Sequence, residues 1–351
     1  MNRRTTDTAG LVLFAAVLLA GPLAAQPAPE VPQPPSTIPS TPSQSPAPVT
    51  PLLGTEAVPV GTVVDERPIP GSFQDDYSRD YEARKGFRTY TWQGTALTVF
   101  PSTLLWTPPL AVKRDPRMMI LASDLKNYRS DYSLDTWIGG TQSILRVEPQ
   151  GIDFAAQLDI FGVVKSRLSP DDLMLADYRF GLPLSFEWGW WHGKIAYEHT
   201  SAHLGDEMIA SRGLFVRSFS KDEIVLGIGR YVGDRKNLRV YGHYAYAVQF
   251  VVPGIEDTAA NRGRFDLGFE WFLREPQGFG GTPFAAANVE WRGDQGHQAN
   301  INLQAGWMWR NPFTREGQFR VFAEHYTGRS PYGQFFAEKE TFTSFGIAFD
   351  Y

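Results

Sequence analysis

The sequence contains no cysteine, so it offers neither a disulfide framework nor a thiol for lipid attachment. Its formal net charge of -5 gives no electrostatic reason to expect a nucleic-acid partner. Beyond the N-terminus, no apolar run is long enough for a membrane-spanning helix. A phosphate-binding loop, a cysteine-based metal site and a nucleotide-binding fingerprint are also missing. Aromatic residues, in contrast, make up 14% of the chain, and without long apolar helices this abundance favours strands.

The N-terminus has the parts of a secretory signal peptide. Arg3 and Arg4 precede an apolar stretch that ends near Ala20, and small residues follow. The alternative is an uncleaved anchor helix, against which Pro22 and the shortness of the apolar stretch argue. We therefore expect residues 1–25 to be a signal peptide that is cleaved on export.

Residues 26–70 are rich in Pro, Ser, Thr and Ala. Such a composition cannot bury a core and favours an extended chain, so we expect a disordered linker. The alternative is that this segment binds a proline-recognition module or peptidoglycan.

From Met118 to the C-terminus, apolar and polar residues alternate in segments separated by Gly, Pro, Asn and Asp. The alternation is clear in IDFAAQLDI (152–160) and in DYRFGLPLSFEW (177–188), where every second residue is apolar. A period of two is typical of strands with two unlike faces. Alternation alone does not separate a soluble β-sandwich from a membrane barrel, because strands in both have one apolar face.

Other features favour the membrane barrel. Trp and Tyr recur at the ends of the apolar faces, as in aromatic girdles, and the segments are long enough for a tilted crossing. The last segment, TFTSFGIAFDY, resembles the C-terminal signal of bacterial outer-membrane barrels, which makes the barrel assembly machinery a predicted partner. Closure also pairs every backbone polar group in lipid. We predict an all-β fold, an antiparallel transmembrane outer-membrane β-barrel over residues 118–351.

About twelve strands are expected in this barrel. They lie near 118–125, 132–147, 151–165, 172–188, 190–203, 220–232, 237–251, 263–274, 282–293, 298–310, 318–328 and 341–351. An even number places both chain ends in the periplasm, with longer outward loops at 204–219, 252–262 and 329–340. The protein is thus expected in the outer membrane, in contact with its lipid, and its oligomeric state is left open.

The inward-facing positions of these strands carry many charges of both signs. They are Asp153, Asp159, Asp177, Arg179, Glu187, Lys194, Glu198, Arg239, His243, Arg264, Asp266, Glu270, Glu290, Arg292, Arg310, Arg320 and Glu324. One interpretation is a lumen closed by ion pairs, and the other is a charged ring that tunes a narrow pore. Residues 71–117 form an N-terminal segment that either stays in the periplasm or plugs the barrel.

Four stretches stand out beside this pattern: VFPSTLLWTPPLAVKRDPRM (99–118), ADYRFGLPLSFEWG (176–189), YEHTSAHLGDE (197–207) and GRSPYGQFF (328–336). Together with the terminal FDY, they resemble a family of bacterial outer-membrane proteins classified only as a domain of unknown function. The resemblance spans about residues 85–351. It implies a signal peptide, a short N-terminal region and an outer-membrane barrel, and it supplies no activity.

The stretch YEHTSAHLGDE contains the residue types of a catalytic site. His199 and Ser201 share the lipid-facing parity of their predicted strand, near the outer leaflet. If the next hairpin closes symmetrically around residues 204–219, Asp222 lies opposite Ser201 on the same face. The serine would then be the nucleophile, His199 its base and Asp222 the group that orients the histidine.

This His-x-Ser pair is similar to that of outer-membrane phospholipase A, and lipid A deacylase barrels also carry such a pair. The phospholipase has Asn and Gly directly after its serine, whereas Ala202 and His203 follow here, and no Asn occupies the expected place on the neighbouring strand. Asp206 and Glu207 are candidate calcium ligands, and calcium would stabilise an oxyanion. The alternatives are a solvated turn for the acidic pair and interfacial hydrogen bonding for the histidine and serine.

From the sequence we predict an outer-membrane barrel with a structural envelope role or a narrow channel. The alternative function is that of a phospholipase A-like acyl-ester hydrolase acting on outer-leaflet lipid, with calcium as its cofactor. Substitution of Ser201 separates the two, because hydrolysis depends on the nucleophile and conductance does not.

Overall fold

The structure is a computed structural model, and it describes residues 89–124, 133–169, 172–206, 208–209, 218–233, 237–273, 277–310 and 318–350. The predicted signal peptide and linker lie outside these residues. Within the described ranges, no helix is long and apolar enough to cross a membrane.

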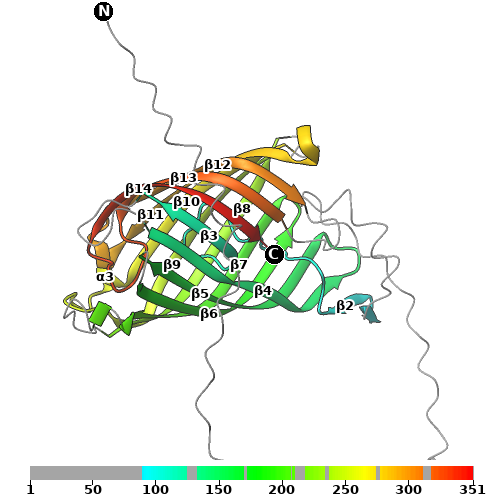
Figure 1. Cartoon of the computed structure of the whole chain (residues 1–351). Helices are drawn as coiled ribbons and strands as arrows, with labels where there is room; N and C mark the ends of the chain where they lie inside the picture. The colour runs from blue at the N-terminus through cyan, green and yellow to red at the C-terminus, as the bar shows by residue number, and fades with distance from the viewer. Residues whose placement is uncertain are drawn as a thin grey trace, which may run out of the picture. The chain divides into compact units, whose positions relative to one another are not determined.

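Strands β3 to β14 form a closed ring in the described part of the chain (Figure 1). Their bounds are β3 Met118–Ser123, β4 Ser133–Pro149, β5 Phe154–Leu168, β6 Leu173–Trp188, β7 Trp191–Leu204, β8 Phe219–Val232, β9 Leu238–Val251, β10 Gly263–Phe272, β11 Thr282–Arg292, β12 Ala299–Arg310, β13 Gln318–Arg329 and β14 Lys339–Asp350. Each strand pairs antiparallel with its chain neighbours, and β14 pairs with β3, which leaves no open edge between the first and last strands. The predicted antiparallel barrel of about twelve strands is confirmed.

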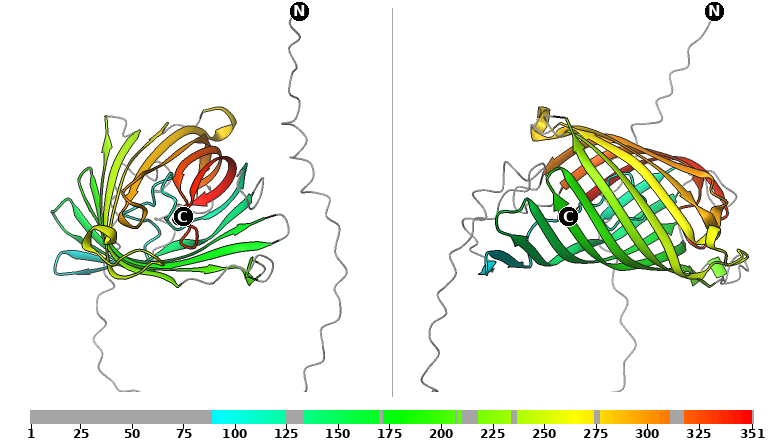
Figure 2. Two further views of the ribbon diagram at one scale, coloured as in Figure 1. Left: turned by 90° about the vertical axis from the view of Figure 1, so that its left-hand side faces the viewer. Right: turned by 180° about the vertical axis from the view of Figure 1, so that it is seen from behind.

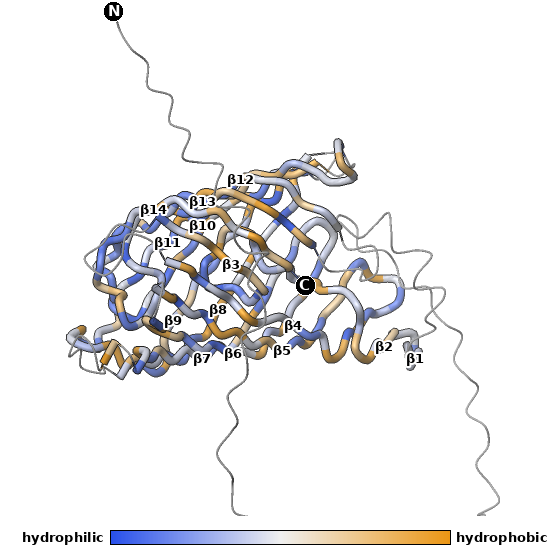
Figure 3. Tube along the Cα trace, viewed as in Figure 1, coloured by the Kyte–Doolittle hydropathy of each residue, from blue (hydrophilic) through white to orange (hydrophobic). Residues whose placement is uncertain are grey.

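Charged side chains face the lumen and apolar side chains face outward. On β6, Tyr178, Phe180 and Leu182 are exposed, while Asp177 and Arg179, which alternate with them, are buried. Figure 3 shows the same alternation of hydrophilic and hydrophobic residues along the strands of the ring. A soluble sandwich would bury the apolar face, so this inverted arrangement defines a barrel that is solvated by lipid.

The connections differ between the two ends of the barrel. At the end that holds the C-terminus, β4–β5 and β6–β7 are joined by the short turns 150–153 and 189–190. The opposite end carries longer connections, including residues 252–262 with helix α3 (Ala259–Arg262), and residues 330–338. These four connections agree with the predicted pattern of short turns and longer outward loops, whereas residues 273–281, between β10 and β11 at the C-terminal end, form a longer connection than it predicts.

Residues 100–117, here called the lumen segment, run through the inside of the ring (Figure 2). The segment begins where Phe100 N donates to Ile144 O of β4 and ends at Met118, the first residue of β3. Its contacts reach the wall on separate strands: Leu110 with Glu270 of β10, Lys113 with Glu324 of β13 and Arg114 with Glu223 of β8. Within the predicted N-terminal segment of residues 71–117, residues 100–117 occupy the lumen, and residues 71–88 lie outside the described residues.

Residues 330–338, here called the cap loop, fold over the outer end of the lumen. Gly333 N donates to Asp177 Oδ2 at 2.9 Å, and Gln334 Nε2 donates to Ala202 O at 2.6 Å. A Cβ added at Gly333 would meet the Ala202 Cβ at 2.6 Å, so only glycine fits this close approach. Tyr332, which is fully buried, lies against Arg167. The loop therefore closes the lumen from the side opposite the entry of the lumen segment.

Two further strands extend the sheet at the C-terminal end of the barrel. Strands β1 (Thr89–Trp92) and β2 (Thr95–Val99) form a hairpin, and β2 pairs with Leu145 to Pro149 of β4. The turn at Gln93 and Gly94 has positive φ at both residues, as a tight two-residue hairpin requires. The hairpin thus delivers the chain directly to the start of the lumen segment.

Most of the predicted inward charges are buried in the lumen, with one correction. Asp153 lies in the exposed turn before β5. Strict alternation from Arg239 and His243 would also place Gln249 in the lumen, but Gln249 is exposed, because a register irregularity after Asp222 makes room for one extra residue on β9. The side chain of Arg310 lies outside those described.

Candidate functional site

The lumen is the first region to consider, because it holds most of the charged groups. Acids and bases pair there within one strand, between neighbouring strands and between a strand and a loop: Asp135 with Arg167, Arg179 with Glu198, Lys194 with Glu198, Lys221 with Asp294, Arg239 with Glu270, Arg264 with Asp266 and Arg320 with Asp350. Pairing offsets much of the cost of burying a charge. This supports the interpretation of the lumen as closed by ion pairs.

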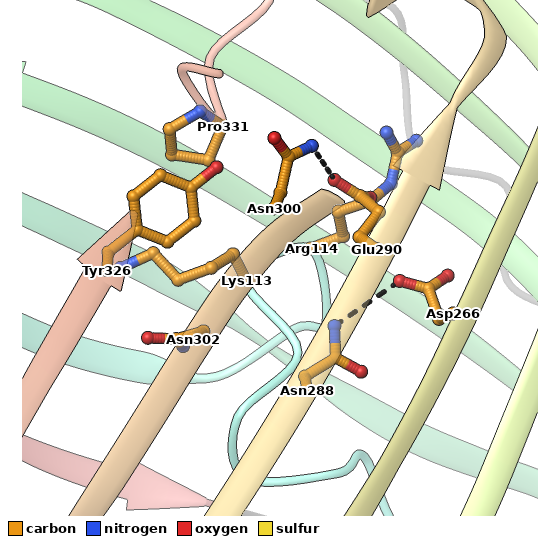
Figure 4. A pocket seen from close by; sticks show the side chains of 9 residues that line it. All are labelled: Lys113, Arg114, Asp266, Asn288, Glu290, Asn300, Asn302, Tyr326 and Pro331. Atoms are coloured by element: carbon orange, nitrogen blue, oxygen red, sulfur yellow. Dashed lines mark hydrogen bonds between the residues drawn. The ribbon is translucent and has the colours of Figure 1, made fainter. Parts of the chain in front are cut away.

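Two small cavities lie between these side chains in the part of the lumen that the structure describes. One cavity of about 10 Å³ lies between the lumen segment, which contributes Lys113 and Arg114, and strands that contribute Asp266, Asn288 and Glu290 (Figure 4). A second cavity, beside Trp106, measures about 20 Å³. Each holds about one water molecule, so neither accommodates a solute.

The second region lies on the outward face of the wall, towards the outer ends of β7 and β8. The strand register places Phe180 of β6, His199 of β7 and Asp222 of β8 side by side in one row. His199 Nδ1 lies 2.5 Å from Asp222 Oδ1, and the two side chains are 26% and 16% exposed. On the other side, the Phe180 ring stacks on the imidazole with 4.9 Å between ring centroids. The imidazole is therefore held from both flanks.

The contact with Asp222 determines what the histidine can do. A carboxylate at Nδ1 favours the tautomer with its proton on that nitrogen, which leaves the lone pair of Nε2 to accept a proton. This is the arrangement of a histidine base with an orienting acid. The sequence-based pairing of His199 with Asp222 is thus present as a contact.

The position of Ser201 differs from the prediction in one respect. Ser201 lies opposite Ser220, and Asp222 lies opposite His199, so the hairpin register is shifted by two residues from the symmetrical closure expected. The length of the connection between β7 and β8 does not by itself fix the register of the two strands. Ser201 shares the outward face of His199, one strand repeat of about 7 Å further out. Among the described residues, no hydrogen bond joins the Ser201 hydroxyl to His199.

The pair of His199 and Asp222 is unusual because it lies on the lipid-facing surface. Among outward-facing positions of the described strands, Asp222 is the one carboxylate, and the row beneath it carries Tyr197 and Ile224. Tyr197 interacts with Asp222, and the irregularity on β9 brings Gln249 opposite Asp222 on its other side. Sequence reasoning missed Phe180, Tyr197 and Gln249 because it followed residue types known in catalysis rather than cross-strand neighbours.

Of the two predicted calcium ligands, only Asp206 lies within the described residues. Asp206 is exposed after the end of β7, and Glu207 lies outside the described residues. Within the described part of the chain, no three His, Asp or Glu side chains gather closely enough to hold a metal ion. The role of calcium therefore stays a prediction.

A closed antiparallel ring with an apolar exterior and a charged, filled interior is a transmembrane β-barrel of the outer-membrane type. The chain belongs to the family described as "Protein of unknown function (DUF1207)", whose model matches residues 94–351.

The solved structures to which this chain is similar include an outer-membrane phospholipase and two porins. Outer membrane phospholipase A from Escherichia coli is 12% identical at a TM-score of 0.43, over 69% of this chain and 93% of that one. The KdgM porin is 8% identical at a TM-score of 0.36, over 67% of this chain and 98% of that one. The NanC porin is 7% identical at a TM-score of 0.38, over 67% of this chain and all of that one. A search of curated protein sequences gives no match.

Proposed function

We propose that this protein is an acyl-ester hydrolase of the outer membrane that acts on lipid of the outer leaflet. Ser201 serves as the nucleophile, His199 as the general base and Asp222 as the residue that orients His199. The observation that carries the proposal is the contact between His199 Nδ1 and Asp222 Oδ1, on the lipid-facing wall with Ser201 beside it on the same face. Export through a cleaved signal peptide of residues 1–25 belongs to the same proposal.

Energetics support a functional origin for this pair. An ionisable side chain on the lipid face of a barrel costs free energy, by an amount that grows with its depth. Neither closure of the ring nor filling of the lumen needs Asp222, because its side chain points away from both. A carboxylate that neither closes the ring nor fills the lumen, and that is costly in lipid, supports a chemical role at that surface.

The residues suggest a two-step reaction. His199 Nε2 accepts the Ser201 proton as the hydroxyl oxygen attacks the acyl carbonyl, and the alcohol leaves with that proton to give an acyl-enzyme. A water molecule, deprotonated by the same nitrogen, then attacks the acyl-enzyme and releases the fatty acid. Asp222 stabilises the imidazolium that forms in each step. A lipid-facing site receives acyl chains directly from the bilayer.

Hydrolysis of detergent-dispersed phospholipid by the refolded full chain tests this proposal, with and without calcium. Turnover by the wild type that is lost in Ser201→Ala and kept in Ser220→Ala supports it. Ser220 is the matched control, because it lies opposite Ser201 on the adjacent strand. Equal turnover in both variants, or none in the wild type under either condition, overturns it.

A structural envelope role is the second candidate, and the filled lumen favours it. The ion pairs and the lumen segment leave cavities no larger than about 20 Å³ in the two places described above. A narrow channel, the other part of the original prediction, requires the lumen segment to move aside. Single-channel recording in planar bilayers tests it: steady conductance by the wild type supports a channel, and a silent bilayer supports a structural barrel.

A further inference from the structure

The β1–β2 hairpin has two chemically different faces. In an antiparallel pair, residues directly opposite each other lie on the same face. Tyr90 opposite Leu97 and Trp92 opposite Thr95 therefore form one face, while Thr89, Thr91, Ala96 and Thr98 form the other. Thr89 and Thr98 hydroxyls are joined by a hydrogen bond of 3.0 Å. One face is thus aromatic and apolar, and the other is dominated by threonine.

The register with the barrel decides where each face points. Leu97 lies opposite Val147, and Val99 lies opposite Leu145, which is exposed on the lipid-facing side of β4. Thr98 lies opposite Arg146, which is buried and bonded to Thr103 of the lumen segment. The aromatic face of the hairpin is therefore continuous with the lipid-facing wall, and the threonine face is continuous with the lumen.

The aromatic side chains of the hairpin are strongly exposed. Tyr90 and Trp92 are 62% and 64% exposed, although exposure of their large apolar rings to water is unfavourable in free energy. They lie at the end of the barrel where Trp188 and Trp191 are also exposed on the outward side. Figure 1 shows the hairpin beyond the ring at the same end as the C-terminus. Aromatic residues at both rims of a membrane barrel form its interfacial girdles.

We propose that the β1–β2 hairpin is an interfacial anchor, with Tyr90 and Trp92 seated among the phospholipid headgroups of the inner leaflet. Trp and Tyr prefer this layer because each ring has an apolar body and a polar group. The argument for lipid is continuity, since the exposed face extends a surface that already contacts lipid. The membrane would thereby hold the hairpin from which the lumen segment enters the barrel.

The absence of cysteine gives this proposal a direct test, because one introduced cysteine takes one label. Trp92→Cys in the full chain carries an environment-sensitive fluorophore in vesicles of phosphatidylethanolamine and phosphatidylglycerol. Thr91→Cys is the matched control, since it lies on the opposite face of the same strand. Ile347→Cys, exposed on the lipid-facing side of β14, gives the signal of full lipid contact.

We expect the label at position 92 to emit at shorter wavelength than the label at 91, and to be quenched by lipid-borne quencher more than by aqueous iodide. The label at 91 should show the reverse preference. Equal iodide quenching at 91 and 92, with no lipid quenching at either, overturns the proposal.

Because β1 pairs only with β2 among the described strands, a second copy could pair with its free edge. Disulfide cross-linking between copies at position 92 without lipid quenching would also overturn it. Tyr90→Cys repeats the measurement if Trp92→Cys fails to refold.

Discussion

Two carboxylates, Glu324 in the lumen and Asp222 on the outer wall, show how differently the same chemical group is treated in this barrel. Glu324 is fully buried and receives Lys113 at 2.5 Å, with further hydrogen bonds from Asn302 and Gln304. Asp222 is half-buried on a surface of apolar side chains and has His199 as its close partner. In the lumen a charge is one member of a network, and its presence reveals little about function. On the lipid face an isolated pair needs its own explanation.

The largest expected effect concerns Asp222, the carboxylate on the outer wall. Asp222→Asn keeps the size of the side chain but removes the charge that stabilises the imidazolium, so kcat should fall by about 10²-fold to 10⁴-fold. Hydrolysis of dispersed phospholipid measures it, with Gln249→Ala as a neighbouring substitution expected to have little effect. Unchanged kcat in Asp222→Asn would make Asp222 a polar surface residue without a catalytic role.

The next effect concerns the buried ion pair between Lys113 and Glu324 in the lumen. Lys113→Met leaves Glu324 buried without its cation, and removal of one partner from a buried ion pair typically costs about 3–5 kcal/mol in the free energy of unfolding. Urea unfolding in detergent, followed by tryptophan fluorescence, measures the loss. The double variant Lys113→Met with Glu324→Gln should recover much of it, because no buried charge is then left alone. If the single variant is as stable as the wild type, the lumen segment contributes little to the closed barrel.

A smaller effect tests whether the wall pair is held from the β6 side. Phe180→Leu removes the aromatic face that stacks on His199, and a ring contact with an imidazolium is worth about 0.5–1 kcal/mol at an exposed site. We expect kcat to fall about twofold to fivefold with KM unchanged, and Phe180→Trp to restore it. Phe265→Leu is the control, since Phe265 is also lipid-facing but stacks on Trp291. Equal losses in both variants would point to a general effect on the barrel.

The smallest effect concerns pH at the outer rim. Burial would raise the pKa of Asp294, but the charges of Arg292 and Lys221 outweigh it and hold that pKa below its usual value of 3.8. A carboxylate with a lowered pKa stabilises the folded state above its unfolded pKa and loses this contribution as the pH falls. The difference in the free energy of unfolding between the wild type and Asp294→Asn should therefore become smaller as the pH falls from 5 to 3. Parallel urea titrations at both pH values measure it, and a constant difference would contradict it.

The strands could be predicted within a few residues because a strand with one face in lipid alternates apolar and polar residues. This alternation is visible in the sequence of strands such as β6. The same parity placed His199, Ser201 and Asp222 on one outward face. It could not give the register between β7 and β8, because the intervening connection allows several closures. It also misplaced Gln249, since one extra residue on β9 reverses the parity without any sign in the residue types.

The place of the N-terminal segment was open for a different reason. Residues such as Trp106 and Arg114 fit a plug or a periplasmic segment equally well by composition. Only their distant partners decide, and Glu223 lies more than a hundred positions from Arg114 in the sequence. Long-range pairing of this kind has no local pattern from which it can be read.

The attachment of the lumen segment at both ends constrains how the barrel assembles. Its start is fixed to β4 through β2 and Phe100, and its end leads into β3, which itself pairs with β4 and with β14. The segment is therefore a tethered loop whose two ends are both held at one strand. Once β14 pairs with β3, the wall has no gap between strands through which that loop could enter the lumen. In the finished barrel, the pairing of β14 with β3 thus completes the wall that surrounds the lumen segment.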